Sequence, residues 1–286
     1  MNKIAAIQMV SGDDVDANLH AADVLIKKAV DKGASLIVLP ENFALFSAAH
    51  YANFLCGPDI NVEYICNFIA QKAQEHKLWI LAGTIPLPKG WENTGRKKSA
   101  DSNHKKRQAA SLLFNAAGEC VGRYNKLHLF DVEVDDQQGH YKESDYFESG
   151  DSSLVADTPV GRLGLTVCYD LRFPELFTTL VKKSAEVIAV PSAFTKFTGQ
   201  AHWETLLRAR AIETQSYIVA ANQGGKHSSG RETYGHSMIV SPWGDIISQC
   251  DQGEGVICAE IDLEKLYSIR KKMPINNHRR FKITSL

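Results

Sequence analysis

The apolar residues of the chain follow two alternating patterns. Short runs of continuous or alternating apolar residues are typical of buried strands, and they are followed by longer stretches with apolar residues every three or four positions, which are typical of helices. The alternation predicts an α/β protein. The predicted strands cover residues 4–9, 35–40, 78–83, 109–115, 120–129, 160–167, 186–191, 216–222, 236–241 and 256–261, and the predicted helices cover residues 18–32, 59–77, 173–184, 201–215 and 263–272.

Two polar segments interrupt this pattern. Residues 86–108 carry glycines and a basic run and are expected to form an exposed loop. The sequence indicates no role for residues 89–108 of this loop. Residues 132–150 form an acidic segment that is longer than a plain connection, which indicates function or mobility. Neither segment has the composition of a linker, so residues 1–286 are expected to form one domain.

The composition limits the kinds of molecule that the chain is expected to bind. A chain of 286 residues with 44% hydrophobic residues can bury a large core. Its formal net charge of -1 provides no electrostatic footprint for nucleic acid or an anionic membrane, and no aromatic residues that could stack bases interrupt the basic run 105–107. We therefore expect a small-molecule partner, with no nucleic acid and no membrane.

The cellular compartment is predicted from two features. The apolar run at residues 1–8 is too short for a signal peptide, and no run approaches the length of a membrane span. The six cysteines lack paired spacing, and a chain of this size needs no disulfide bonds. A cytoplasmic protein with reduced cysteines is expected.

Cys168 is the cysteine whose position suggests chemistry. It follows the predicted strand 160–167 and precedes a helix whose first turn suits Pro174. A thiol at a helix N-terminus is favoured as thiolate, the form that attacks a carbonyl carbon. The alternative is an inert buried thiol, which is the usual state of an unpaired cysteine.

Two other strand ends carry groups that complement a thiol. Glu41 follows the predicted strand 35–40, and Lys126 stands towards the end of the predicted strand 120–129. Ligands bind at strand ends in α/β sheets, so Glu41, Lys126 and Cys168 could converge. A carboxylate can accept the thiol proton, and an ammonium can stabilise an oxyanion. Taken singly, Glu41 could be a helix cap and Lys126 an exposed lysine on an edge strand.

Three motifs carry a resemblance to a known family. Residues 39–43 (LPENF), 124–130 (YNKLHLF) and 167–175 (VCYDLRFPE) resemble the nitrilase superfamily of carbon-nitrogen hydrolases, and the likeness covers nearly the whole chain. Three further segments are most similar to the Nit branch, the branch of the deaminated glutathione amidases. These segments are residues 191–195 (PSAFT), 202–213 (HWETLLRARAIE) and 234–244 (YGHSMIVSPWG).

The resemblance implies a fold and a mechanism. The fold is a four-layer α-β-β-α sandwich, and the catalytic triad is Glu41 as general base, Cys168 as nucleophile and Lys126 as oxyanion stabiliser, assisted by the backbone N–H of Tyr169. Glu143 matches the position of a second family glutamate that would orient Lys126 or the attacking water; alternatively it is one more charge in the acidic segment. This mechanism needs no metal and no organic cofactor.

The substrate expected from the resemblance is a linear, non-peptide carboxamide, most directly deaminated glutathione. Arg172 could grip a substrate carboxylate, or it could form an ion pair with Glu175 or Asp170. Phe194, Thr195 and Thr198 are candidate pocket walls, although ordinary loop packing would also explain them. His128, His202 and His236 are expected to be structural, because no second histidine lies at ligand spacing from any of them.

Two alternatives to this function remain open. The first is an ω-amidase that acts on α-ketoglutaramate, and the second is a non-catalytic binding scaffold; a nitrilase that acts on nitriles fits the Nit-branch resemblance less well. The resemblance also implies a homodimer or a larger homo-oligomer. Residues 173–184, residues 201–215 and the tail after Pro274 are the interface candidates.

Overall fold

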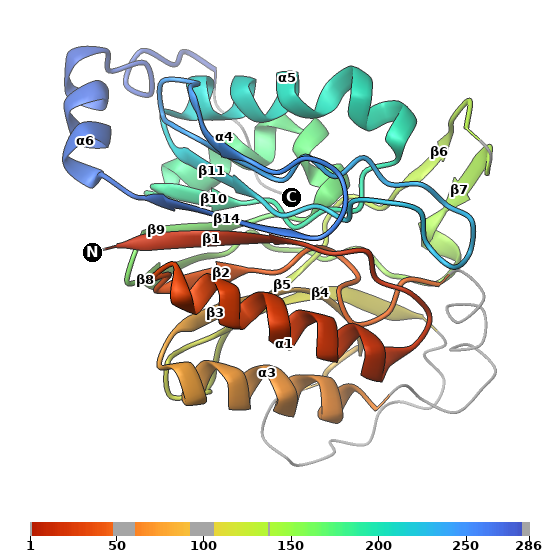
Figure 1. Cartoon of the computed structure of the whole chain (residues 1–286). Coiled ribbons are helices and arrows are strands. Elements are labelled where there is room, and N and C mark those ends of the chain that lie inside the picture. Colours follow the sequence, from red (N-terminus) through yellow and green to blue (C-terminus); the bar gives the residue numbers. More distant parts are fainter. Residues whose placement is uncertain (1, 48–60, 92–105, 137, 282–286) are drawn as a thin grey trace.

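Two six-stranded sheets lie face to face between two layers of helices (Figure 1). The computed structural model describes residues 2–47, 61–91, 106–136 and 138–281. Helices α1 and α3 cover the outer face of the first sheet, and α4 and α5 cover that of the second. The predicted α/β class and the four-layer sandwich are therefore confirmed.

The first sheet has the strand order β14-β1-β2-β3-β4-β5. Strands β1, β2 and β3 are parallel, and the other strands pair antiparallel. The strands of this sheet are β1 (Lys3–Gln8), β2 (Leu36–Val38), β3 (Trp79–Pro88), β4 (Arg107–Phe114), β5 (Cys120–Asn125) and β14 (Gly255–Glu260), and its helices are α1 (Val15–Asp31) and α3 (Val62–His76).

The second sheet has the order β13-β12-β11-β10-β9-β8, with a parallel centre of β9, β10 and β11. Helix α6 follows β14 and buries Leu266 in the core shared with this sheet. The strands of this sheet are β8 (Val155–Thr158), β9 (Gly161–Leu165), β10 (Val187–Ala189), β11 (Tyr217–Ala220), β12 (Met238–Val240) and β13 (Ile246–Gln249), and the helices are α4 (Pro174–Lys182), α5 (Lys196–Thr214) and α6 (Leu263–Lys272).

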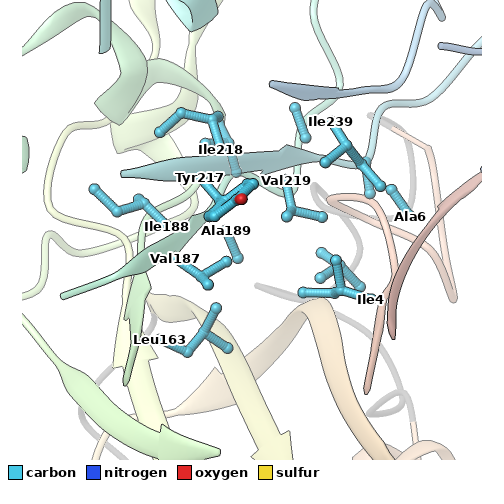
Figure 2. Close-up of a cluster of buried hydrophobic side chains, with 14 of the residues drawn as sticks. Ile4, Ala6, Leu163, Val187, Ile188, Ala189, Tyr217, Ile218, Val219 and Ile239 are labelled. Atoms are coloured by element: carbon cyan, nitrogen blue, oxygen red, sulfur yellow. The ribbon is translucent and has the colours of Figure 1, made fainter. Parts of the chain in front are cut away.

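The core between the sheets follows from the two-residue period of the strands. Ile4 and Ala6 of β1 face the second sheet, where they join a cluster that includes Leu163 of β9 (Figure 2). Ala5 and Ile7, on the opposite face of β1, join a separate cluster with α1 and α3. Strands buried on both faces explain why the central runs are continuously apolar.

Several elements differ from the predicted ones for local reasons. Helix α5 begins at Lys196 rather than at residue 201, because the Thr195 hydroxyl accepts a hydrogen bond from the Thr198 N–H and caps the helix. Strand β5 ends at Asn125, which leaves Lys126 just beyond the strand. The acidic segment contains a short hairpin, β6 (Asp131–Glu133) with β7 (His140–Lys142). Edge strands β8 and β13 were not predicted, because both are short and partly exposed.

The cysteines and the predicted polar loop lie only partly within the described ranges. The five cysteines in the described ranges are unpaired, and Cys56 lies outside them. Most of the predicted polar loop, residues 92–105, and the first two residues of the predicted helix 59–77 also lie outside. None of the helices in the described ranges has the length and apolar character of a membrane-spanning segment.

Candidate active site

Three strand ends meet where the two sheets face each other. Glu41 and Lys126 follow β2 and β5 of the first sheet, and Cys168 follows β9 of the second. The Nζ atom of Lys126 lies 2.8 Å from Oε1 of Glu41. The carboxylate of Glu41 also forms a hydrogen bond with the Cys168 thiol. The structure therefore brings the three residues of the predicted triad together, each sheet contributing part of the cluster.

Lys126 is buried rather than exposed. Its side chain is 2% exposed, and its Nζ atom donates hydrogen bonds to both carboxylate oxygens of Glu143, at 3.0 and 2.8 Å. Burial alone would lower the pKa of Lys126, but the charges of Glu143 and Glu41 outweigh burial and hold this pKa well above its usual value. Lys126 is therefore an ammonium group, and the surface-lysine alternative is wrong.

Glu143 is fixed against Lys126 by a second donor. The backbone N–H of Phe130 donates a hydrogen bond of 2.7 Å to Oε2 of Glu143. Burial raises the pKa of Glu143, and the nearby charge of Glu41 adds to this effect. Because Glu143 contacts the ammonium directly, its geometry suits the orienting of Lys126.

The backbone at Cys168 turns sharply. Its φ angle is +48°, in the left-handed region that non-glycine residues seldom adopt, and its N–H donates to the Pro191 carbonyl at 2.8 Å. A short 3₁₀ helix, Cys168–Arg172, follows directly. The Ala193 N–H also donates a hydrogen bond to the Cys168 sulfur. The turn thereby presents the sulfur to the Glu41 carboxylate.

The state of the Cys168 thiol corrects the sequence prediction. Burial raises the pKa of this thiol well above its usual value, and the negative charge of Glu41 raises it further, against a smaller opposing effect of Lys126. The expectation of a thiolate favoured by a helix N-terminus was wrong, because α4 begins only at Pro174 and burial dominates. A thiol with a raised pKa holds its proton at neutral pH, so its attack on a carbonyl carbon needs a base.

This protonation state predicts slow reaction with thiol reagents. At pH 7 we expect methyl methanethiosulfonate to modify Cys168 slowly, with a rate that rises about tenfold per pH unit up to at least pH 9, because the thiolate is the reactive form. Glu41→Gln removes the carboxylate charge and should speed the modification at each pH. Peptide mass spectrometry measures the rate at Cys168; a fast rate that is independent of pH above pH 7 would contradict the assignment.

Asp170 links the segment of Cys168 to the segment of Lys126. Its buried carboxylate accepts hydrogen bonds from the Tyr124 hydroxyl at 2.7 Å and from the Val167 N–H at 2.9 Å. It also accepts from the backbone N–H of His128 at 3.0 Å and lies 2.7 Å from its Nδ1 atom. Tyr124 and His128 flank Lys126 in the chain, so Asp170 ties the segment of Lys126 to the segment of Cys168.

Glu41 is held by both sheets. The Gln223 side chain, beyond β11, donates to the Glu41 carbonyl at 3.1 Å, and the next residue, Asn42, donates its N–H to the Thr84 hydroxyl of β3 at 2.9 Å. Gly83 permits this packing, because a Cβ atom there would lie 1.7 Å from the Pro40 carbonyl oxygen. The position of the carboxylate is thus set by the packing of the sheets.

A cavity of about 420 Å³ opens onto the cluster, and the side chains of Glu41, Lys126, Glu143 and Cys168 line it. Tyr169 also lines the cavity, and its backbone N–H donates to no acceptor in the described ranges. A free N–H beside the Cys168 sulfur suits an oxyanion. The hairpin of β6 and β7 stands at this end of the sandwich (Figure 1).

Arg172 lines the cavity without a carboxylate partner. Its Nη1 atom lies 3.3 Å from Nδ1 of His202, and its guanidinium carbon lies 5.3 Å from the ring centre of Phe194. Among the described residues it forms no ion pair, and Asp170 is committed to other donors. The predicted alternative of an ion pair with Glu175 or Asp170 is wrong.

Phe194, Thr195 and Thr198 also line the cavity, as predicted. Two of them have a structural role as well, since Thr195 caps α5 and its hydroxyl lies 2.8 Å from that of Thr198. Phe194 packs against Trp203, with ring centres 4.8 Å apart. Loop packing and pocket lining therefore both apply.

Sequence reasoning missed several of the lining residues, among them Phe46, Tyr141 and Arg231. Phe46 and Arg231 lie in connections without regular periodicity, and Tyr141 lies in the three-residue strand β7, so no pattern singled them out. Within the described ranges, no three His, Cys, Asp or Glu side chains are grouped so as to hold a metal ion. The predicted site residues thus line one cavity, together with a guanidinium that the sequence analysis did not include.

Comparisons with known proteins identify similar chains. A family model described as carbon-nitrogen hydrolase matches residues 3–271. The deaminated glutathione amidase of Yersinia enterocolitica is 42% identical over 97% of this chain and 93% of that protein. The human protein of the same name is 40% identical over 97% of this chain and 82% of that protein.

Solved structures are similar over the whole fold. The Caenorhabditis elegans NitFhit protein matches with a TM-score of 0.83 and 37% identity, and the match covers 98% of this chain and 65% of that longer chain. Saccharomyces cerevisiae Nit3, a member of branch 10 of the nitrilase superfamily, matches with a TM-score of 0.80 and 30% identity over 98% of this chain and 97% of that one.

Proposed function

The chain belongs to the carbon-nitrogen hydrolase family, and we propose that it is an amidase that hydrolyses deaminated glutathione through a thioester on Cys168. One observation carries the mechanism: the Glu41 carboxylate contacts both the Cys168 thiol and the Lys126 ammonium at the wall of a cavity. Relatives named deaminated glutathione amidase support the choice of substrate.

In the first step the Cys168 sulfur attacks the amide carbonyl carbon. Glu41 accepts the thiol proton as the C–S bond forms, and the carbonyl π electrons move to the oxygen. The Lys126 ammonium and the Tyr169 N–H stabilise the resulting oxyanion, because both are fixed beside the sulfur before the substrate binds. Glu143 holds the ammonium in place.

In the second step the C–N bond breaks. Glu41 returns its proton to the leaving amine, and the carbonyl re-forms as a thioester on Cys168. From deaminated glutathione the leaving amine is cysteinylglycine, whereas α-ketoglutaramate would release ammonia. Water then attacks the thioester, Glu41 accepts the water proton and returns it to the sulfur, and 2-oxoglutarate is released with the thiol restored.

The position of Arg172 in the cavity favours a substrate whose acyl part carries a carboxylate. A guanidinium without a carboxylate partner can bind a substrate carboxylate through two parallel hydrogen bonds. The acyl part of deaminated glutathione is a 2-oxo acid. We therefore assign Arg172 to the carboxylate of the acyl part.

The test is intact-protein mass spectrometry with peptide mapping after mixing the protein, or a Glu143→Gln variant that deacylates slowly, with deaminated glutathione. We expect a 2-oxoglutaryl adduct on Cys168 and release of cysteinylglycine. If only α-ketoglutaramate gives an adduct and a product, this smaller amide is the substrate. No adduct and no product with either amide would favour the binding-scaffold alternative.

We also propose that the protein acts in the cytoplasm as a homodimer. Exposed apolar side chains on and beside α5 support an interface there: Ile212 is 46% exposed and Trp243 is 57% exposed. In the predicted interface tail, Phe281 is 92% exposed. Sedimentation velocity tests the dimer, and a monomer at every concentration would contradict it.

A further inference from the structure

A second guanidinium, that of Arg231, lines the cavity from the connection between β11 and β12. Its carbon atom Cζ lies 4.9 Å from the ring centre of Phe46 and 5.0 Å from that of Tyr141. Its Nη2 atom donates a hydrogen bond of 3.1 Å to the Ala193 carbonyl. Because the Ala193 N–H donates to the Cys168 sulfur, one residue connects this guanidinium to the nucleophile.

The charge of Arg231 is not neutralised within the described ranges. Arg231 forms no ion pair there, and its buried Nε atom donates no hydrogen bond. The neighbouring Glu232 is paired instead with Lys196, at 3.1 Å. A buried donor without an acceptor is unfavourable, so Arg231 retains a donor that an acceptor from a ligand could satisfy.

The connection that carries Arg231 is rigidly anchored. His227 lies 2.7 Å from the Ser11 carbonyl through Nδ1 and 2.7 Å from the Thr233 hydroxyl through Nε2. Burial lowers the pKa of His227 to about 4, and the charge of Arg231 contributes to this effect. The His227 ring also stacks on Phe46, with centres 3.9 Å apart. The guanidinium is therefore positioned before any ligand arrives.

The two guanidinium groups line the same cavity from different segments of the chain. Arg172 lies on the segment of Cys168, which retains the acyl group. The Arg231 guanidinium contacts the rings of Phe46 and Tyr141. Phe46 lies on the segment that carries Glu41, and Tyr141 lies on the segment that carries Glu143. Glu41 gives its proton to the leaving amine, so the amine departs on the side of these carboxylate segments.

We propose that Arg231 binds a carboxylate on the leaving-amine side of the scissile amide, so that the site selects amides that carry an acid at both ends. This inference rests on the proposed amidase function. Deaminated glutathione meets the requirement, because its acyl part is a 2-oxo acid and its amine part ends in the glycine carboxylate. The ammonia released from α-ketoglutaramate carries no acid.

The experiment compares three amides with the wild-type protein and Arg231→Gln: deaminated glutathione, its C-terminal glycinamide, and α-ketoglutaramate. Hydrogen bonds to a charged group contribute about 1.5–3 kcal/mol, so Arg231→Gln should lower kcat/KM for deaminated glutathione about 10- to 100-fold, mainly through KM. Turnover of α-ketoglutaramate should stay within about twofold. In the wild type, kcat/KM for the glycinamide should be lower than kcat/KM for deaminated glutathione by a similar factor. In Arg231→Gln the two values of kcat/KM should be nearly equal.

Two variants serve as controls. Lys196→Gln breaks the neighbouring ion pair with Glu232 and should leave all three amides unaffected, whereas Arg172→Gln should weaken all three. Equal losses on deaminated glutathione and α-ketoglutaramate in Arg231→Gln, or loss on neither, would overturn the proposal. A wild type that hydrolyses the glycinamide as fast as the acid would also overturn it, and that comparison needs no variant. Absence of wild-type turnover with every amide would instead contradict the proposed function.

Discussion

Replacing Cys168 with alanine is expected to abolish amide hydrolysis while the fold remains intact. The thioester cannot form without the sulfur, and loss of a catalytic nucleophile typically costs about 10⁴- to 10⁶-fold in kcat. The side chain faces the cavity and is small, so its truncation should lower the free energy of unfolding by only about 1 kcal/mol. Steady-state kinetics and urea unfolding measure the two effects.

Cys168→Ser is the matched control for this experiment. Serine keeps a hydrogen bond to Glu41 but is a weaker nucleophile, so this variant should also lose nearly all activity and stay folded. Both variants should still bind deaminated glutathione in calorimetry. If Cys168→Ala retains more than about one per cent of the wild-type hydrolysis rate, Cys168 is not the nucleophile.

Replacing Lys126 with methionine is expected to impair both catalysis and stability. Removal of one oxyanion donor costs about 10²- to 10³-fold in kcat. The change also leaves the carboxylates of Glu41 and Glu143 buried without their cation, and breaking a buried ion pair costs about 3–5 kcal/mol. Kinetics and urea unfolding of the same preparation measure the two losses.

A double variant separates the two effects. Adding Glu143→Gln to Lys126→Met removes one unpaired carboxylate, so part of the lost stability should return. Activity should not return, because the oxyanion still lacks its ammonium. A Lys126→Met protein that retains activity within about tenfold of wild type would show that Lys126 is only structural.

The convergence of the site could be predicted because each reactive group stands at a strand end. Glu41 and Cys168 follow apolar runs whose direction and burial are encoded locally. Glu143 required the resemblance to a family, since nothing in its acidic surroundings distinguishes it. Its contact with Lys126 depends on the fold of the hairpin of β6 and β7.

The electrostatic state of the site could not be predicted from local sequence. A helix N-terminus acts on Cys168 through its neighbours in the chain, whereas burial and the charge of Glu41, which is contributed by the other sheet, raise the pKa of its thiol. Arg231 escaped notice for the same reason. Its role depends on Phe46 and Tyr141, which are distant in sequence, and its own segment has no regular period.

The division of the site between two sheets links activity to assembly of the sandwich. Glu41 and Lys126 belong to one sheet and Cys168 to the other, and the apolar core of Ile4, Ala6 and Leu163 holds the sheets together. A refolding intermediate that has formed both sheets but has not docked them would contain all the secondary structure and none of the chemistry. Catalytic activity is therefore a direct reporter of sheet docking.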